Sequence, residues 1–181
     1  MIFRFDDVCI NANMELINDM TNFLFDRFPN CTVLWGVSPL VHDMSDTTGK
    51  TAERIFPQIL NAHSDHRLFF NVDFAGIPAL HPKATMAGHG LIHVDHRLLT
   101  YEQQEMSIII SASLVKSKIF IPPFNKWNKD TDAICKEHGI ELIKFEDWWL
   151  SMEHNSFDDK HGMWYLHARE FKFEDFKKWF N

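Results

Sequence analysis

Residues 1–7 read Met-Ile-Phe-Arg-Phe-Asp-Asp, an apolar and aromatic run that stops at two adjacent carboxylates. This is the pattern of a buried strand that reaches a polar edge. Further along the chain, apolar stretches of strand length alternate with stretches whose apolar residues recur at helical spacing. Strands separated by helices predict βα units around a parallel sheet or barrel. The expected strands are 1–5, 31–37, 68–72, 119–121, 140–145 and 163–166, and the expected helices are 13–28, 51–61, 100–116, 129–138 and 173–180.

Capping residues mark where two of these helices begin and end. Thr100 and Gln103 form a capping box at the start of the helix over 100–116. Asn128 is a suitable N-cap for the helix over 129–138, and Gly139 is a suitable residue for its C-terminus. The chain contains no linker, repeat or low-complexity segment, so we expect residues 1–181 to form a single domain.

Composition and charge narrow the class of protein. The formal net charge of −7 argues against a broad nucleic-acid interface, which needs clustered Lys and Arg. No window approaches 18 consecutive apolar residues, so we expect no membrane-spanning helix. The three cysteines have no Cys-x-x-Cys spacing, which favours free thiols in a reducing compartment. We therefore expect a cytoplasmic protein that binds no nucleic acid, and the sequence leaves its oligomeric state open.

Polar and aromatic side chains recur where the expected strands end. Parallel α/β folds place their chemistry at the carboxyl ends of the strands, so these residues are candidates for one shared site. Taken singly, a histidine or an aromatic ring at such a position is more often structural. The candidates are Asp6 and Asp7, residues 123–125, Asp147 and Trp148, and His167.

Two of the motifs suggest metal chemistry. Asp6 and Asp7 repel each other, and a metal on one carboxylate with general-base work for the other would resolve that repulsion. A solvated loop pair or a helix N-cap is the alternative interpretation. His89 and His93 lie four apart, and on a helical turn two such histidines point the same way and can share one metal ion. Because the chain has eleven histidines, this spacing is weak evidence by itself.

The order of these motifs is more specific than any one of them. Asp-Asp, His-x-x-x-His, Pro-Pro-Phe, Asp-Trp and Leu-His follow one another between residues 3 and 168. This order resembles the five-motif layout of the polysaccharide deacetylase family, the carbohydrate esterases with a NodB-type domain. The resemblance implies an α/β fold, a distorted (β/α) barrel of about seven parallel strands. It also implies a divalent metal ion, zinc in first place, with cobalt, nickel or iron as alternatives.

The resemblance assigns a role to each motif. Asp7, His89 and His93 would bind the metal ion. Asp6 would be the general base that takes a proton from the attacking water, and His167 would protonate the departing amine. Leu166 and Trp148 would wall the pocket for the acyl methyl group. The full set of substrate-binding residues that it implies is Pro123, Phe124, Asn125, Asp147, Trp148 and Leu166.

The third motif departs from the family pattern. Ile121 stands where the family has an arginine that steadies the catalytic aspartate, and we expect Lys126 or Asn128 to replace it. Phe124 stands in place of a tyrosine, and Asn125 in place of the usual glycine. These changes indicate an altered substrate-binding loop.

The function that the sequence favours is a metal-dependent hydrolase that removes an N-acetyl or other acyl group from an intracellular sugar or glycan precursor. One alternative is a catalytically altered member of the fold that binds a sugar or a protein partner. Another is a hydrolase of a small amide that is not a sugar. The segments 42–65 and 154–161 match no motif, and their role is not assigned.

Overall fold

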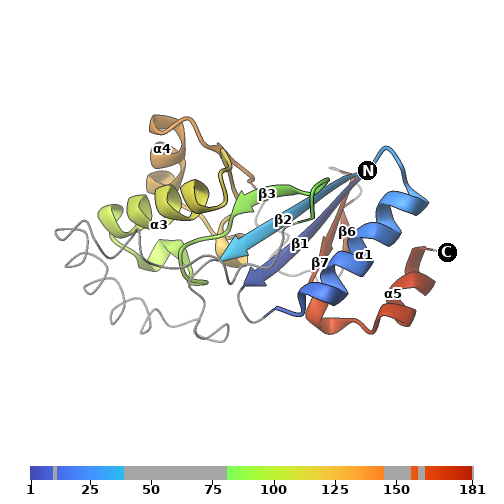
Figure 1. Ribbon diagram of the computed structural model, residues 1–181. Helices are drawn as coiled ribbons and strands as arrows, with labels where there is room; N and C mark the ends of the chain where they lie inside the picture. Colours follow the sequence, from blue (N-terminus) through green and yellow to red (C-terminus); the bar gives the residue numbers. More distant parts are fainter. Residues whose placement is uncertain (10–11, 39–80, 145–155, 159–161, 181) are drawn as a thin grey trace.

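The computed structural model describes residues 1–9, 12–38, 81–144, 156–158 and 162–180. These residues build one seven-stranded sheet with the order β5-β4-β3-β2-β1-β7-β6 (Figure 1). β1, at Ile2–Cys9, is flanked by β2 and β7. The other strands are β2 at Thr32–Ser38, β3 at Thr85–Gly88, β4 at Ile119–Phe120, β5 at Glu141–Leu142, β6 at Ser156–Asp158 and β7 at Met163–Leu166.

Six of the seven strands run parallel, from β5 across to β7, and β6 pairs antiparallel with β7. The sheet curls into a half-barrel with helices around it, so the expected α/β barrel architecture is confirmed. The expectation of about seven parallel strands is slightly high, because the seventh strand of the described sheet is antiparallel.

The predicted strands are confirmed where polar and apolar residues alternate or where apolar residues form a continuous run. β1, β2, β4, β5 and β7 all fall at expected positions, although β5 is shorter than predicted. β3 was not expected, since Thr-Met-Ala-Gly has no period-two pattern and few strand-forming residues. β6 has only three residues and was also missed. The expected strand over 68–72 and the expected helix over 51–61 lie outside the described residues.

Four α-helices occur where the apolar spacing predicted them, namely α1 at Met14–Arg27, α3 at Tyr101–Leu114, α4 at Lys129–Glu137 and α5 at Phe173–Phe180. The predicted caps are present. Thr100 and Gln103 bond each other reciprocally at the start of α3, and the Asn128 side chain accepts two backbone N–H bonds at the start of α4. Within the described ranges, no helix has the length and apolarity needed to cross a membrane.

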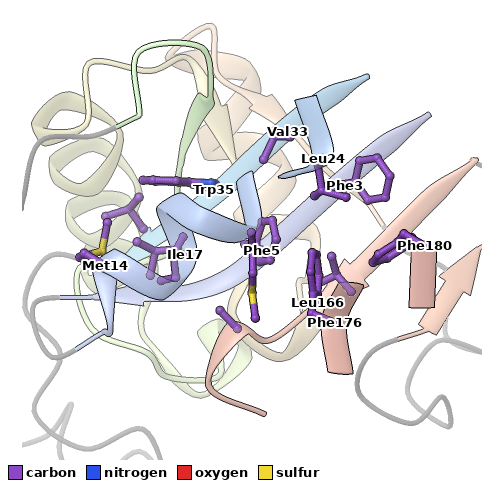
Figure 2. Close-up of a cluster of buried hydrophobic side chains, with 14 of the residues drawn as sticks. Phe3, Phe5, Met14, Ile17, Leu24, Val33, Trp35, Leu166, Phe176 and Phe180 are labelled. Carbon is purple, nitrogen blue, oxygen red and sulfur yellow. The ribbon is translucent and has the colours of Figure 1, made fainter. Parts of the chain in front are cut away.

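The two faces of the central strands bury different kinds of side chain. Phe3 and Phe5 of β1 belong to an apolar cluster with Trp35 of β2 and with Phe176 of α5 (Figure 2). α1 and α5 pack together over this face, since both contribute apolar residues to the cluster (Figure 1). Successive residues of a strand point to opposite faces, so Arg4 lies on the other face, inside the half-barrel.

α3 and α4 cover the other end of the sheet, where α3 packs on β3 and β4 and α4 packs on β5 (Figure 1). A second apolar cluster joins them, with Ile108 of α3, Phe120 of β4 and Ile134 of α4 buried together. The helices thus support the strands from outside and leave the carboxyl ends of β1, β3 and β7 for polar residues.

Candidate active site

Asp6 and Asp7 lie in a bulge of β1, in the middle of the sheet. The register of β1 against β2 shifts between Phe5 and Val8, so one extra residue must be accommodated. Asp7 takes up a left-handed backbone with a φ of 61°, which costs a non-glycine residue about 1–2 kcal/mol. Both carboxylates are buried. They lie inside the strand rather than after it, because the bulge lets β1 continue to pair beyond them.

His89 and His93 reach the same point from the segment that follows β3. His89 Nε2 lies 3.6 Å from Asp7 Oδ1, and His93 Nε2 lies 3.0 Å from the same oxygen. The two imidazole rings are 5.1 Å apart. The helical turn expected here is wrong: residues 89–95 form an irregular loop, and a short 3₁₀ helix begins only at His96. The loop itself brings both rings to Asp7.

The three side chains fit a divalent metal ion. Their ligand atoms all lie within 4.8 Å of one another, and all three residues are buried. His89 Nδ1 lies 2.9 Å from the carbonyl oxygen of Ile121, so its proton is held there and Nε2 keeps a lone pair toward the site. Among the described residues, this buried Nε2 has no hydrogen-bond partner. Two imidazoles and one carboxylate, with a second-sphere bond that orients one ring, form a typical ligand set for zinc and related ions.

The environment of Asp7 also favours a ligand in its charged form. Burial by itself raises the pKa of this carboxyl, but its interactions with the neighbouring His89 and His93 side chains outweigh burial. The net effect holds the pKa of Asp7 well below its usual range. Asp7 is therefore ionised at neutral pH, as metal binding requires.

His167 closes the site from β7. Its Nε2 lies 3.3 Å from Asp7 Oδ2 and 3.1 Å from the hydroxyl oxygen of Tyr165. Its Nδ1 lies 4.0 Å from a carboxylate oxygen of Glu170. Tyr165 and Glu170 were not singled out in the sequence. Tyr165 could have been found from strand alternation, because a residue two before His167 shares its face.

Asp6 has a bidentate partner on its own strand. Arg4 Nε lies 2.6 Å from Asp6 Oδ1, and a second guanidinium nitrogen donates to Oδ2. The expectation that Lys126 or Asn128 holds Asp6 is wrong. Lys126 Nζ lies 3.7 Å from a carboxylate oxygen of Asp95, and Asn128 caps α4. The sequence carries a signal for Arg4, because a charged residue inside an apolar strand needs a buried partner.

No protein-family model and no curated protein sequence matches the chain. Solved structures do resemble it. A family 4 carbohydrate esterase from Streptomyces lividans, in complex with acetate, aligns with 93% of this chain and 78% of its own, at a TM-score of 0.51 and 12% sequence identity. The chain has the fold of the family 4 carbohydrate esterases. The NodB-like fold that the motif order implied is thereby confirmed.

Two further structures with this esterase fold align at lower TM-scores. The peptidoglycan deacetylase PdaC from Bacillus subtilis has a TM-score of 0.46 and 11% identity, and the alignment covers 99% of this chain and 92% of that one. A family 4 pseudoenzyme from Bacillus anthracis has a TM-score of 0.47 and 10% identity, with 80% of this chain and 42% of that one covered.

In this esterase fold, the loop after β4 lies against the histidines. The Phe124 ring centroid is 4.3 Å from that of His93, in an edge-to-face contact. Phe124 and Asn125 both have a φ of 56°, and Pro123 is buried beneath them. The side-chain oxygen of Asn125 is buried and has no hydrogen-bond partner among the described residues. The structure thus brings the predicted loop residues to the edge of the site.

The remaining predicted residues are not at the site or are not described. Leu166 is fully buried in the apolar cluster with Phe5 and Phe176, on the face covered by α1 and α5 (Figure 2). The expectation that Leu166 walls an acyl pocket is therefore wrong, because the pleat of β7 turns Tyr165 toward the site and Leu166 away from it. Asp147 and Trp148 lie outside the described residues, as does the segment 42–65, and of the segment 154–161 only 156–158 are described, as β6.

Proposed function

We propose that this protein is a metal-dependent deacetylase that removes an N-acetyl or related acyl group from a sugar or glycan precursor. The observation that supports this most directly is the meeting of Asp7, His89 and His93 within 4.8 Å at one buried point. Asp6 and His167 lie beside that point, where a general base and a general acid would be needed. The esterase fold is consistent with the reaction class.

The proposed chemistry divides proton transfer between two residues. Asp7, His89 and His93 would hold a divalent cation, which would supply Lewis-acid chemistry for the acyl carbonyl and for the attacking water. The Asp6 carboxylate accepts a proton from the attacking water. His167 Nε2 donates a proton to the departing nitrogen, and a Glu170 carboxylate oxygen lies 4.0 Å from its Nδ1.

An intracellular substrate is part of the proposal. Three cysteines without Cys-x-x-Cys spacing suit a reducing compartment, and Cys135 is buried as a free thiol. Burial raises the pKa of the Cys135 thiol to about 12, so it stays protonated and unreactive. We infer that the substrate is an intracellular N-acylated sugar or glycan precursor, a class that includes nucleotide-linked and lipid-linked N-acetyl sugars.

The first experiment measures metal content by mass spectrometry on untagged protein, for the wild type and for His89→Ala. We expect about one equivalent of divalent metal in the wild type and a loss of metal in the variant. Acetate release is then measured with N-acetylglucosamine and its nucleotide-linked form as probes. Wild-type protein that stays empty after incubation with zinc, cobalt and nickel would contradict the hydrolase mechanism.

A further inference from the structure

We propose that Arg4 is the positioning residue for Asp6, and that it keeps the Asp6 carboxylate from becoming a metal ligand in place of Asp7. This inference rests on the proposed function, and it concerns how two adjacent carboxylates acquire different roles. Arg4 lies two residues before Asp6 on β1. No motif in the sequence singles it out.

The contact between Arg4 and Asp6 fixes the carboxylate in two directions. Nε bonds Oδ1 and a terminal guanidinium nitrogen bonds Oδ2, so both oxygens are held by one planar group. Paired bonds of this kind set the rotation of the carboxylate as well as its distance. Arg4 is fully buried and Asp6 almost so. Solvent therefore has little access to screen or replace the pair.

The guanidinium is itself held in place from the neighbouring strand. Arg4 pairs with Tyr165 in the parallel register of β1 and β7. The guanidinium carbon of Arg4 lies 4.8 Å from the centre of the Tyr165 ring, within cation–π distance. The Tyr165 hydroxyl in turn lies 3.1 Å from His167 Nε2. Arg4 thus belongs to a buried row that connects the proposed base with the proposed acid.

Charge explains why this pairing separates the roles of the two aspartates. Asp6 Oδ2 lies 3.8 Å from His89 Nε2, so Asp6 is within reach of the proposed metal ligands. A cation would attract either carboxylate. With both Asp6 oxygens bonded to Arg4, Asp7 is the carboxylate that turns an oxygen, Oδ1, toward both His89 and His93. Asp6 remains oriented beside the ligands, where it can accept a proton.

In this chain, Asp6 is positioned by Arg4 and not by the loop after β4. Ile121, at the position where the resemblance places an arginine, is fully buried in an apolar cluster with Leu34 and Ala87. Its backbone carbonyl orients His89 instead. The missing loop arginine therefore does not by itself indicate a catalytically altered protein, because Arg4 of β1 supplies a guanidinium to Asp6.

The first test separates turnover from metal binding. Arg4→Lys keeps the positive charge but loses the paired bonds, and we expect kcat for acetate release to fall about 10- to 100-fold with metal content unchanged. Wild-type kcat in this variant would overturn the inference, and so would a parallel loss of metal, which indicates a merely structural role.

If Arg4→Lys does not fold, Arg4→Gln/Asp6→Asn is compared with Asp6→Asn. A further loss of turnover in the double variant would then contradict a role that acts through Asp6.

The second test needs no activity, so it distinguishes this inference from the proposed function. Asp7→Asn weakens the metal site, and we expect zinc content to fall well below one equivalent. In Arg4→Gln/Asp7→Asn, Asp6 is released and should restore zinc toward one equivalent. Unrestored zinc in the folded double variant would overturn the claim that Arg4 withholds Asp6. A wild type that binds zinc but turns over no acylated probe would count against the proposed function alone.

Discussion

Asp6 and Asp7 are neighbours in the chain but have different partners, and this difference defines the site at the scale of single residues. The side chain of Asp6 faces Arg4 on one side and lies 3.8 Å from His89 Nε2 on the other. Asp7 faces His89, His93 and His167, within 3.0–3.6 Å of each. The bulge in β1 makes this possible, because a regular strand would turn the two carboxylates to opposite faces of the sheet.

At this scale we expect Asp6→Asn to keep the metal and to lose turnover by about 10²- to 10⁴-fold, since the amide cannot accept a proton as a general base. Metal content and acetate release, measured on the same preparation, test this. Asp26→Asn, an exposed change on α1, is a matched control with the same chemistry. Unchanged turnover in Asp6→Asn would exclude Asp6 as the base.

His93→Ala should release the metal and lower the Tm of metal-loaded protein, because a ligand bound only to the folded state stabilises it. The added stability is about 2.7 kcal/mol when free metal is 100 times its Kd. His81→Ala is the control, since His81 bonds the Asn22 side chain and belongs to neither group of described residues that could hold a metal ion. Full metal occupancy in His93→Ala would show that it is not a ligand.

At the scale of elements, the register between strands decides which side chains enter the site. β1 and β7 pair with Arg4 beside Tyr165 and Phe5 beside Leu166. Because side chains alternate along both strands, the first pair faces the inside of the half-barrel and the second pair faces α1 and α5. A slip of β7 by one residue would turn Leu166 inward in place of Tyr165 and remove the ring against which the Arg4 guanidinium packs.

β2 provides the space in which Asp6 lies. Gly36 is opposite the bulge, and a Cβ there would lie 3.0 Å from Asp6 Oδ1 and 3.4 Å from His89 Cγ. We expect Gly36→Ala to displace the Asp6 carboxylate and to lower kcat about tenfold or more.

Gly139→Ala is the matched control for Gly36→Ala. Its backbone has a φ of 63° with open space around the added methyl group, so it should cost about 1 kcal/mol of stability and leave kcat unchanged. Equal effects of the two substitutions on kcat would contradict a steric role for Gly36. Urea unfolding and acetate release measure both quantities.

At the scale of the whole molecule, the parallel sheet gathers residues that are far apart in the chain. His89 and His167 directly follow β3 and β7, Asp6 lies in the carboxyl-terminal half of β1, and parallel strands bring these parts to one edge of the sheet (Figure 1). The irregular loop that carries His89 and His93 is anchored to α3 by a buried network. His96 Nδ1 bonds the carbonyl of Val94, and its Nε2 lies 3.0 Å from the Ser107 hydroxyl.

This network gives the whole protein a pH-dependent stability. Burial lowers the pKa of His96 from 6.5 to about 4, so the folded state binds this proton less readily than the unfolded state does. The stabilisation is present above pH 6.5 and is lost as the pH falls toward 4, a total of about 3 kcal/mol. Urea unfolding in EDTA across this range measures the loss, since chelation removes any metal contribution.

His96→Gln is the comparison for this prediction, since glutamine is a polar side chain that does not titrate. We expect its free energy of unfolding to fall less steeply with acid than that of the wild type. Any remaining slope belongs to other groups such as Asp7, whose lowered pKa also makes stability fall in acid. Parallel curves for the two proteins would contradict the assignment to His96.

Local patterns in the sequence sufficed for most elements. α1, α3, α4 and α5 occur where helical spacing and caps predicted them, and β7 has the predicted limits. These features depend on neighbours within a few residues, and the sequence displays such neighbours directly. The order of the motifs also predicted the fold, and it predicted that the carboxylates and histidines would meet.

Only the tertiary structure decided which residues face one another. The sequence assigned support of Asp6 to Lys126 or Asn128, whereas the fold assigns it to Arg4. It assigned Leu166 to the pocket, whereas the pairing of β7 with β1 turns Tyr165 inward. Which side chains of β7 face the site depends on how β7 aligns with β1, and the paired residues of these two strands are more than 150 positions apart in the chain. Strand alternation in the sequence places Tyr165 on the same face as His167, but local patterns do not show which face of β7 is turned toward the site, because that depends on the register with β1.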